Sequence, residues 1–177
     1  MSLDASLAIS LNSLAGISPI IDAIIVFFAS YLAYSIAAGV LVLLVVSVFA
    51  YREKREMLMV ALISALVARG VVTELIRAAY HRPRPFSDLP VHNLFTDSAW
   101  SFPSGHATFF FALATAVYLY NKKWGTILLG AAILIAISRV VAGVHYPSDI
   151  VAGAGIGVLI AYLTYFIYKK LGEKVDD

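Results

Sequence analysis

The sequence has no cysteine and few charged residues, and both shortages limit what the protein can be. Of the 177 residues, 14% are Asp, Glu, Lys or Arg, whereas soluble domains usually carry about 25%. The lack of cysteine excludes disulfides, zinc–thiolate sites and thiol nucleophiles. The net charge of +2 is too small to indicate a nucleic-acid partner. The composition therefore argues against a water-soluble domain.

Apolar residues dominate instead, at 61% of the chain and a mean hydropathy of +0.87. A helix needs about 20 apolar residues to cross a bilayer. Residues 57–80, 106–120, 124–141 and 150–168 meet or approach this length. We therefore predict an all-α, polytopic membrane bundle that forms a single domain over residues 1–177.

The N-terminal third has a less obvious organisation. Residues 18–50 contain one charge, Asp22, and one straight helix of that length would measure about 50 Å, too long for an upright span. We predict that Ser18 caps a short helix with Pro19 at its first position. A break near residues 30–35 would follow, and then a full span to Ala50. The total is five transmembrane helices, or six if the first part also crosses.

The first 17 residues are predicted to form an interfacial amphipathic helix. Their leucines, Leu3, Leu7, Leu11 and Leu14, fall on one face of a helix. Such a helix lies in the plane of the membrane surface rather than across it.

Basic residues are distributed unevenly along the chain. Eight of the thirteen follow alternate spans and so share one side of the membrane. The positive-inside rule predicts that this side is cytoplasmic. These residues are Arg52, Lys54, Arg55, Lys122, Lys123, Lys169, Lys170 and Lys174.

Three polar clusters lie at the opposite ends of the last four spans, where they are able to converge. Ionisable groups near a membrane are functional by default, although a single arginine there is usually a snorkelling anchor, which is our interpretation of Arg82. The clusters are Arg77-x6-Arg84-Pro85, Pro103-Ser104-Gly105-His106 and Ser138-Arg139-x5-His145-x3-Asp149.

The arginines and the helix start are suited to binding a phosphate. Arginine presents a planar fork of donors that matches phosphate oxygens, so Arg77, Arg84 and Arg139 are candidate ligands. Ser104 and Gly105 precede a helix, whose free N–H groups and dipole attract anions. Glycine at that point allows a close backbone approach.

The histidines are suited to nucleophilic and acid–base chemistry. Asp149, four residues after His145, can fix the tautomer of that ring and leave its other nitrogen free to attack phosphorus. His106, on another helix, is the candidate general acid. Mid-span Arg69 is left with three alternatives: an ion pair with Asp22, an ion pair with Glu74, or a contact to substrate.

These clusters resemble the signature of the phosphatidic acid phosphatase type 2 superfamily, which also includes vanadium haloperoxidases and glucose-6-phosphatase. The family pattern is Lys-x6-Arg-Pro, Pro-Ser-Gly-His and Ser-Arg-x5-His-x3-Asp. The second and third motifs match in full, and Arg77 stands where the family usually has Lys. The resemblance implies a haloperoxidase-like catalytic core, here over residues 57–170, that needs no metal or other cofactor.

The resemblance also implies roles for individual residues. It makes His145 the nucleophile, Asp149 its partner and His106 the general acid. It assigns phosphate binding to the remaining motif residues, which are Arg77, Arg84, Ser104, Gly105 and Arg139.

The short chain and its opening, Ser18-Pro19-Ile20-Ile21-Asp22, are similar to those of bacterial undecaprenyl-diphosphate phosphatases. That similarity implies a multi-pass protein of the cytoplasmic (inner) membrane that acts on the extracytoplasmic face and recycles the carrier lipid of peptidoglycan biosynthesis. Alternative substrates are phosphatidylglycerophosphate, phosphatidic acid and lipid A. A remote alternative is a non-enzymatic membrane protein whose arginines bind anionic lipids.

Overall fold

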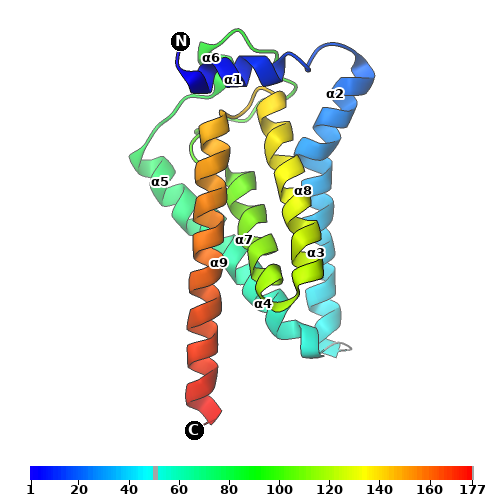
Figure 1. Ribbon diagram of the computed structural model, residues 1–177, viewed down its shortest axis with the longest axis vertical. Coiled ribbons are helices and arrows are strands. Elements are labelled where there is room, and N and C mark those ends of the chain that lie inside the picture. The colour runs from blue at the N-terminus through cyan, green and yellow to red at the C-terminus, as the bar shows by residue number, and fades with distance from the viewer. Residues whose placement is uncertain (50–51, 177) are drawn as a thin grey trace.

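The computed structural model describes residues 1–49 and 52–176, and side chains 48, 52, 53 and 173–176 lie outside the described set. Within the described residues all regular secondary structure is helical, as predicted (Figure 1). In chain order the elements are α1 (Leu3–Asn12), α2 (Pro19–Val26), η1 (Phe27–Tyr31), α3 (Leu32–Phe49), α4 (Arg52–Leu66), η2 (Val67–Val72), α5 (Thr73–Ala79), α6 (Pro85–Asp88), α7 (Gly105–Tyr120), α8 (Lys122–Val141) and α9 (Pro147–Asp176).

Five of these helical stretches are apolar enough to cross a membrane. Four are long enough by the usual criterion, namely Pro19–Ser47, Lys54–Ala79, Lys122–Val141 and Pro147–Gly172, and Gly105–Tyr120 is a shorter apolar helix. The described residues therefore support five crossings rather than six.

The predicted break near residues 30–35 is wrong. Elements α2, η1 and α3 follow one another without interruption from Pro19 to Phe49, and η1 is a π-helical turn that absorbs an extra residue. Ser35 does not interrupt the helix because its hydroxyl donates to the carbonyl of Tyr31, 2.8 Å away. The predicted start is confirmed, since Oγ of Ser18 accepts from the N–H of Ile21 at 3.3 Å.

Helix α7 lies in the middle of the bundle and packs against α4, α8 and α9 (Figure 1). Small residues line these contacts, so the backbones approach closely. Large apolar side chains face outward instead: Leu41, Val42, Leu43 and Val45 are each more than half exposed. Such a surface requires lipid as its solvent, and the chain is a multi-pass membrane protein.

Helix α9 packs closely against α7 at two of its glycines. A side chain at Gly157 would meet the carbonyl oxygen of Thr108 at 2.6 Å, and one at Gly153 would meet that of Ser104 at 2.8 Å. Gly155 has open space around it. Positions four apart share a helix face, while the residue midway between them points elsewhere.

Helix α1 lies across one end of the bundle, above α8 and α9 (Figure 1). Its buried face consists of Ala5, Ala8 and Asn12. Leu3 and Leu7 of the predicted apolar face are 77% and 44% exposed. These two leucines therefore point away from the bundle, whereas Leu11 packs against its buried residues. Contact of the helix with the membrane surface stays a prediction.

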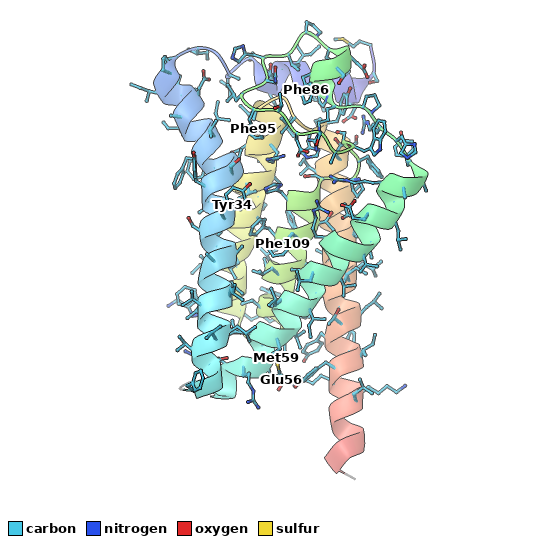
Figure 2. The ribbon with its side chains drawn as sticks, turned by 180° about the vertical axis from the view of Figure 1, so that it is seen from behind. Tyr34, Glu56, Met59, Phe86, Phe95 and Phe109 are labelled. Carbon is cyan, nitrogen blue, oxygen red and sulfur yellow. The ribbon has the colours of Figure 1, made fainter. Side chains whose placement is uncertain are left out.

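The opposite end of the bundle contains the end of α3, the start of α4 and the α7–α8 connection (Figure 1). Figure 2 shows Glu56 at that end and Phe86 at the end with α1. Glu56 accepts from the ammonium of Lys169 and from the hydroxyl of Tyr120, each at 2.7 Å. One carboxylate thus joins α4, α7 and α9 far from the candidate site.

Candidate active site

The three motifs meet at the end of the bundle that α1 covers. Nη2 of Arg77 donates to the carbonyl of Pro103 at 3.1 Å, which joins the first motif to the second. The N–H of Ser104 donates to the carbonyl of Asp149, also at 3.1 Å, which joins the second to the third. The predicted convergence is therefore present in the structure.

His145 and Asp149 form a buried pair with side-chain exposures of 1% and 0%. Nδ1 of His145 lies 3.3 Å from Oδ2 of Asp149. The same oxygen accepts from the N–H of Tyr146 at 2.9 Å and from the hydroxyl of Ser101. The carboxylate is thus held from several sides, and the imidazole takes its orientation from it.

The partners of the ring assign its tautomer. Nε2 of His145 lies 3.3 Å from Nη1 of Arg84, and a guanidinium has donors only. Nε2 therefore presents its lone pair, and the proton resides on Nδ1 facing Asp149. Burial lowers the pKa of His145 to about 4, although the bond to Asp149 raises it. A neutral ring with an unprotonated Nε2 is the form that a nucleophile requires.

The three arginines of the motifs are almost fully buried at this end of the bundle: Arg77, Arg84 and Arg139 have exposures of 5%, 3% and 3%. Arg84 contacts Nε2 of His145, and Arg139 is close enough for electrostatic interaction with that ring. Among the described residues, Nε of Arg77 and Nε of Arg139 have no hydrogen-bond partner. Buried donors without acceptors are costly, so a site containing them is suited to an anion that supplies several oxygens.

A carboxylate from the connecting loop already lies among these arginines. Oδ2 of Asp97 is 2.8 Å from Nη2 of Arg84 and 3.3 Å from Nη2 of Arg139. Burial raises the pKa of Asp97, but the guanidinium groups of Arg84 and Arg139 and the N–H of Ala99 together lower it by more. The net effect is a pKa below the usual value for an aspartate. The group is ionised at neutral pH and occupies an anion position.

The start of α7 has the geometry of a capped helix. Oγ of Ser104 accepts from the N–H of Ala107 at 3.4 Å, so the hydroxyl acts as the N-cap. A side chain at Gly105 would lie 2.4 Å from Nε of Arg69. Gly105 therefore leaves room beside the start of α7 for the guanidinium of Arg69. Phosphate binding by Ser104 and Gly105 stays a prediction.

His106 lies at the edge of an apolar pocket of about 200 Å³ beside the site. It is close enough to Arg139 and His145 for electrostatic interaction with both. Figure 2 shows Tyr34 and Phe109, two of the residues that line the pocket, below the loops of the site. The full lining is Ala33, Tyr34, Ala37, Arg69, Gly105, His106, Phe109 and Phe110.

Comparison with known proteins gives a match over the part of the chain that contains the three motifs. The model of the PAP2 superfamily matches residues 58–173. This chain belongs to the PAP2 superfamily. Undecaprenyl-diphosphatase BcrC of Bacillus subtilis is 32% identical over 168 residues, covering 94% of this chain and 85% of that protein. Lipid A 1-phosphatase of Rhizobium etli is 33% identical over 132 residues, covering 68% of this chain and 57% of that protein.

Two solved structures are similar to the fold. LpxE of Aquifex aeolicus superposes with a TM-score of 0.75 at 30% identity, covering 93% of this chain and 96% of that one. The transmembrane PAP2-type phosphatidylglycerolphosphate phosphatase of B. subtilis gives 0.70 at 24% identity, covering 96% and 88%. The second likeness bears on the fold alone.

The interpretation of Arg82 as a snorkelling anchor is wrong for this PAP2 protein. Its guanidinium turns inward and donates to Oδ1 of Asp149 at 2.6 Å. The signal was in the Arg82-Pro83-Arg84-Pro85 run, because residues two apart in an extended segment point the same way. Arg84 has extended backbone dihedrals, so Arg82 reaches the same centre.

Ser101 and Asp97 lie at the site although the sequence analysis assigns neither of them a role. Neither residue lies in a family motif, and both reach the site through the fold of an irregular loop. Of the alternatives for Arg69, the ion pair with Glu74 is present, and a contact to substrate stays a prediction. Oε1 of Glu74 also lies 3.5 Å from Nη1 of Arg77.

Proposed function

We infer that this protein hydrolyses the terminal phosphate of a lipid pyrophosphate, undecaprenyl diphosphate, through a phosphohistidine at His145. The observation that carries this proposal is the unprotonated Nε2 of His145 beside Arg84, at the end of the bundle where the buried Nε groups of Arg77 and Arg139 have no acceptor among the described residues. A phosphoryl group is an electrophile with oxygens that these donors fit.

In the first step Nε2 of His145 attacks the terminal phosphorus, and the bond from phosphorus to the leaving oxygen breaks. Arg77, Arg84 and Arg139 stabilise the charge on the equatorial oxygens. Asp97 must leave its position between Arg84 and Arg139 for phosphate to bind both. His106 donates a proton to the leaving oxygen where that oxygen requires one.

In the second step water attacks the phosphorus of phosphohistidine. His106 in its neutral form accepts a proton from that water, and the bond between phosphorus and Nε2 breaks. Phosphate departs and the ring of His145 returns to its starting tautomer. The proton stays on Nδ1 of His145 throughout, and Asp149 accepts a hydrogen bond from it.

The apolar pocket beside His106 supports a lipid leaving group. It opens beside α3 and α7, and its walls include Ala33, Ala37 and Phe110. Apolar chains bind such surfaces without any hydrogen-bond partner. The first isoprene units of the substrate would occupy it while the pyrophosphate lies among the arginines.

A second candidate is the phosphate monoester of lipid A or of a glycerophospholipid such as phosphatidylglycerophosphate or phosphatidic acid. The observation that favours it is the likeness to lipid A 1-phosphatase of Rhizobium etli, which is 33% identical over 132 residues. Both candidates use the same phosphate site and differ in the group that leaves.

We place the active site on the extracytoplasmic face of the cytoplasmic membrane. The described basic residues of the predicted inner side include Arg55 in the first turn of α4, Lys123 in the first turn of α8 and Lys170 towards the end of α9. Figure 1 shows these ends of the three helices away from α1 and the site. Arg52 and Lys174, which belong to the same prediction, lie outside the described side chains. Since the chain has no cysteine, single Ser87→Cys and Lys123→Cys variants can be labelled in intact cells with an impermeant maleimide. Labelling is expected at residue 87, and labelling at 123 alone would reverse the orientation.

The test of the activity uses the purified full chain in detergent with EDTA. Each variant is incubated with terminally ³²P-labelled undecaprenyl diphosphate and then denatured without acid. The wild type should retain the label and His145→Ala should not. His81→Ala, the matched control, should behave like the wild type. Phosphate release is then compared for undecaprenyl diphosphate, phosphatidylglycerophosphate, phosphatidic acid and lipid A. If undecaprenyl diphosphate ranks last, the second candidate replaces the first. If His145→Ala retains full function, an anionic-lipid-binding protein is the better description.

A further inference from the structure

Arg82 connects the candidate catalytic pair to the N-terminal helix. Its Nη1 donates to Oδ1 of Asp149 at 2.6 Å and to Oγ of Ser148 at 2.7 Å, and its Nη2 donates to Oδ2 of Asp4 at 2.6 Å. The guanidinium also lies over the ring of Tyr146, 3.9 Å from its centroid. With 20% of its side chain exposed, Arg82 is held in one position.

Asp4 holds Arg82 from the other side and is itself bound to the start of α9. Its Oδ1 accepts from the N–H of Ser148 at 2.9 Å, and its Oδ2 accepts from the hydroxyl of Ser148 at 2.5 Å. Burial raises the pKa of Asp4, but the bonds from Ser148 and Arg82 lower it more. An ionised carboxylate at a helix N-terminus is favourable, so Asp4 joins α1 to the helix that contains Asp149.

The consequence for Asp149 follows from how its two oxygens are divided. Arg82 binds Oδ1, while Oδ2 is left to Nδ1 of His145, the N–H of Tyr146 and the hydroxyl of Ser101. Without Arg82, a fully buried oxygen loses its charged donor, and the carboxylate is free to rotate. The positive charge also favours the ionised carboxylate, which keeps the shared proton on the imidazole.

We propose that Asp4 and Arg82 are positioning residues for the reaction, which act through Asp149 to hold Nε2 of His145 at the angle of attack. On this proposal α1 is part of the active centre and not only a membrane-surface helix. The inference rests on the proposed phosphohistidine chemistry. It adds Asp4 and Arg82, neither of which is a specified position of the three family motifs.

The competing explanation is that the Asp4–Arg82 pair only docks α1 onto the bundle. The chain offers a matched control for this. Asn12, also on α1, donates to the carbonyls of His92 and Val141 at 2.8 Å each, and its side-chain oxygen accepts from the N–H of His92 at 2.7 Å. Asn12→Ala therefore loosens the docking of α1 without touching Asp149.

The experiment measures kcat, KM, the rate of ³²P-histidine formation and the thermal midpoint for the full-length wild type, Arg82→Ala, Arg82→Lys, Asp4→Asn and Asn12→Ala. Arg82→Ala is expected to lower kcat and the labelling rate roughly ten- to hundredfold, as loss of a supporting partner does at other sites, with KM changed less than threefold. Asp4→Asn should show a smaller loss of the same kind. Arg82→Lys should recover part of the rate, because an ammonium restores the charge but cannot bridge both carboxylates.

Asn12→Ala should lower the thermal midpoint at least as much as Asp4→Asn, with kcat within threefold of wild type. The double variant Asp4→Asn/Arg82→Ala should lose no more rate than Arg82→Ala alone. Equal losses of kcat in Asn12→Ala and Asp4→Asn, or a wild-type labelling rate in Arg82→Ala, would overturn the inference while leaving the proposed function in place. A wild type that forms no phosphohistidine would overturn the proposed function, and the inference with it. If Arg82→Ala does not fold, Arg82→Lys and Asp4→Asn decide the matter.

Discussion

Arg84 directs a guanidinium N–H at Nε2 of His145, the proposed attacking nitrogen, with 3.3 Å between Nη1 and Nε2. The same guanidinium donates to the carbonyls of Val144 and Ala99, at 2.7 and 2.8 Å. Backbone carbonyls therefore hold Arg84 in place. Its Nη1 group is placed to donate to an incoming phosphoryl oxygen instead of to the imidazole.

The first prediction concerns this geometry. Arg84→Lys keeps the charge but loses the planar fork, so it cannot keep both backbone contacts and also bind phosphate. We expect kcat/KM to fall roughly a hundredfold or more, in the range seen when one transition-state donor is removed. The control is Arg55→Lys at the far end of the bundle, which should match the wild type. An Arg84→Lys enzyme within threefold of wild type would exclude the fork as the reason for arginine here.

The second prediction is a pH dependence set by His145. Burial lowers the pKa of His145 from 6.5 to about 4, so the free enzyme keeps its nucleophile neutral well below pH 6.5. The acid limb of kcat/KM should therefore lie nearer pH 4 to 5, once ionisation of the substrate is followed separately by ³¹P NMR. The free energy of unfolding should depend on pH in the same direction, because the folded protein favours the neutral ring. This contribution to stability is complete above pH 6.5 and is lost as the pH falls towards 4. An acid limb at the pH of free imidazole, unrelated to the substrate, would contradict this.

The third prediction separates the two kinds of substrate through His106. An alkoxide leaving group needs a proton, whereas a departing phosphate, with a pKa near 6, needs little help. His106→Ala should therefore slow phosphohistidine formation from a lipid monoester by roughly a hundred- to ten-thousandfold. Formation from the diphosphate should slow much less. Equal losses with both substrates, measured by rapid quench with His81→Ala as control, would mean that His106 is not the acid.

The fourth prediction concerns the internal anion. Asp97 lies against Arg84 and Arg139 with 34% of its side chain exposed, so it competes with a phosphate for both. Asp97→Asn removes that competition and should tighten inhibition by vanadate, on the order of tenfold or less because solvent screens the charge. Asp88→Asn, in exposed α6, is the matched control. Weaker vanadate binding in Asp97→Asn would show instead that Asp97 orients the arginines.

The fifth prediction concerns stability. Gly157→Ala places a methyl group 2.6 Å from the carbonyl oxygen of Thr108, whereas Gly155→Ala meets nothing within 4 Å. The first should cost about 1–3 kcal/mol through overpacking between α7 and α9. The second should leave the thermal midpoint in detergent within a degree or two of wild type. Similar behaviour of the two variants would show that α7 and α9 separate easily.

The motif residues could be selected from the sequence because each brings its own chemistry at a short, fixed spacing. His145 and Asp149 lie four residues apart, so one turn of helix places them together wherever the helix lies. Arg84 and Arg139 were recognisable because buried charge in an apolar chain must have a use. The helix starts at Pro19 and Gly105 were equally local, since both depend on a capping serine one residue earlier.

The continuity of α2, η1 and α3 was missed for a different reason. The length of an upright span suggested a break, but neither proline nor glycine lies between residues 27 and 35, and a π-turn accommodates the extra residue within the helix. Local composition favours one continuous helix, and the thickness of a bilayer does not by itself require a break in it.

By itself, the sequence determined the apolar helices, the side that carries the basic residues and the three motifs, because all of these depend on residue type and on spacing within a few turns. The tertiary structure alone decided that Asp4, Arg82, Asp97 and Ser101 join the site. The contact from Asp4 to Ser148 spans 144 positions, and that from Arg82 to Asp149 spans 67. Contacts of that kind depend on where irregular loops and a surface helix dock, and the geometry of docking is a property of the packed bundle, not of any local pattern.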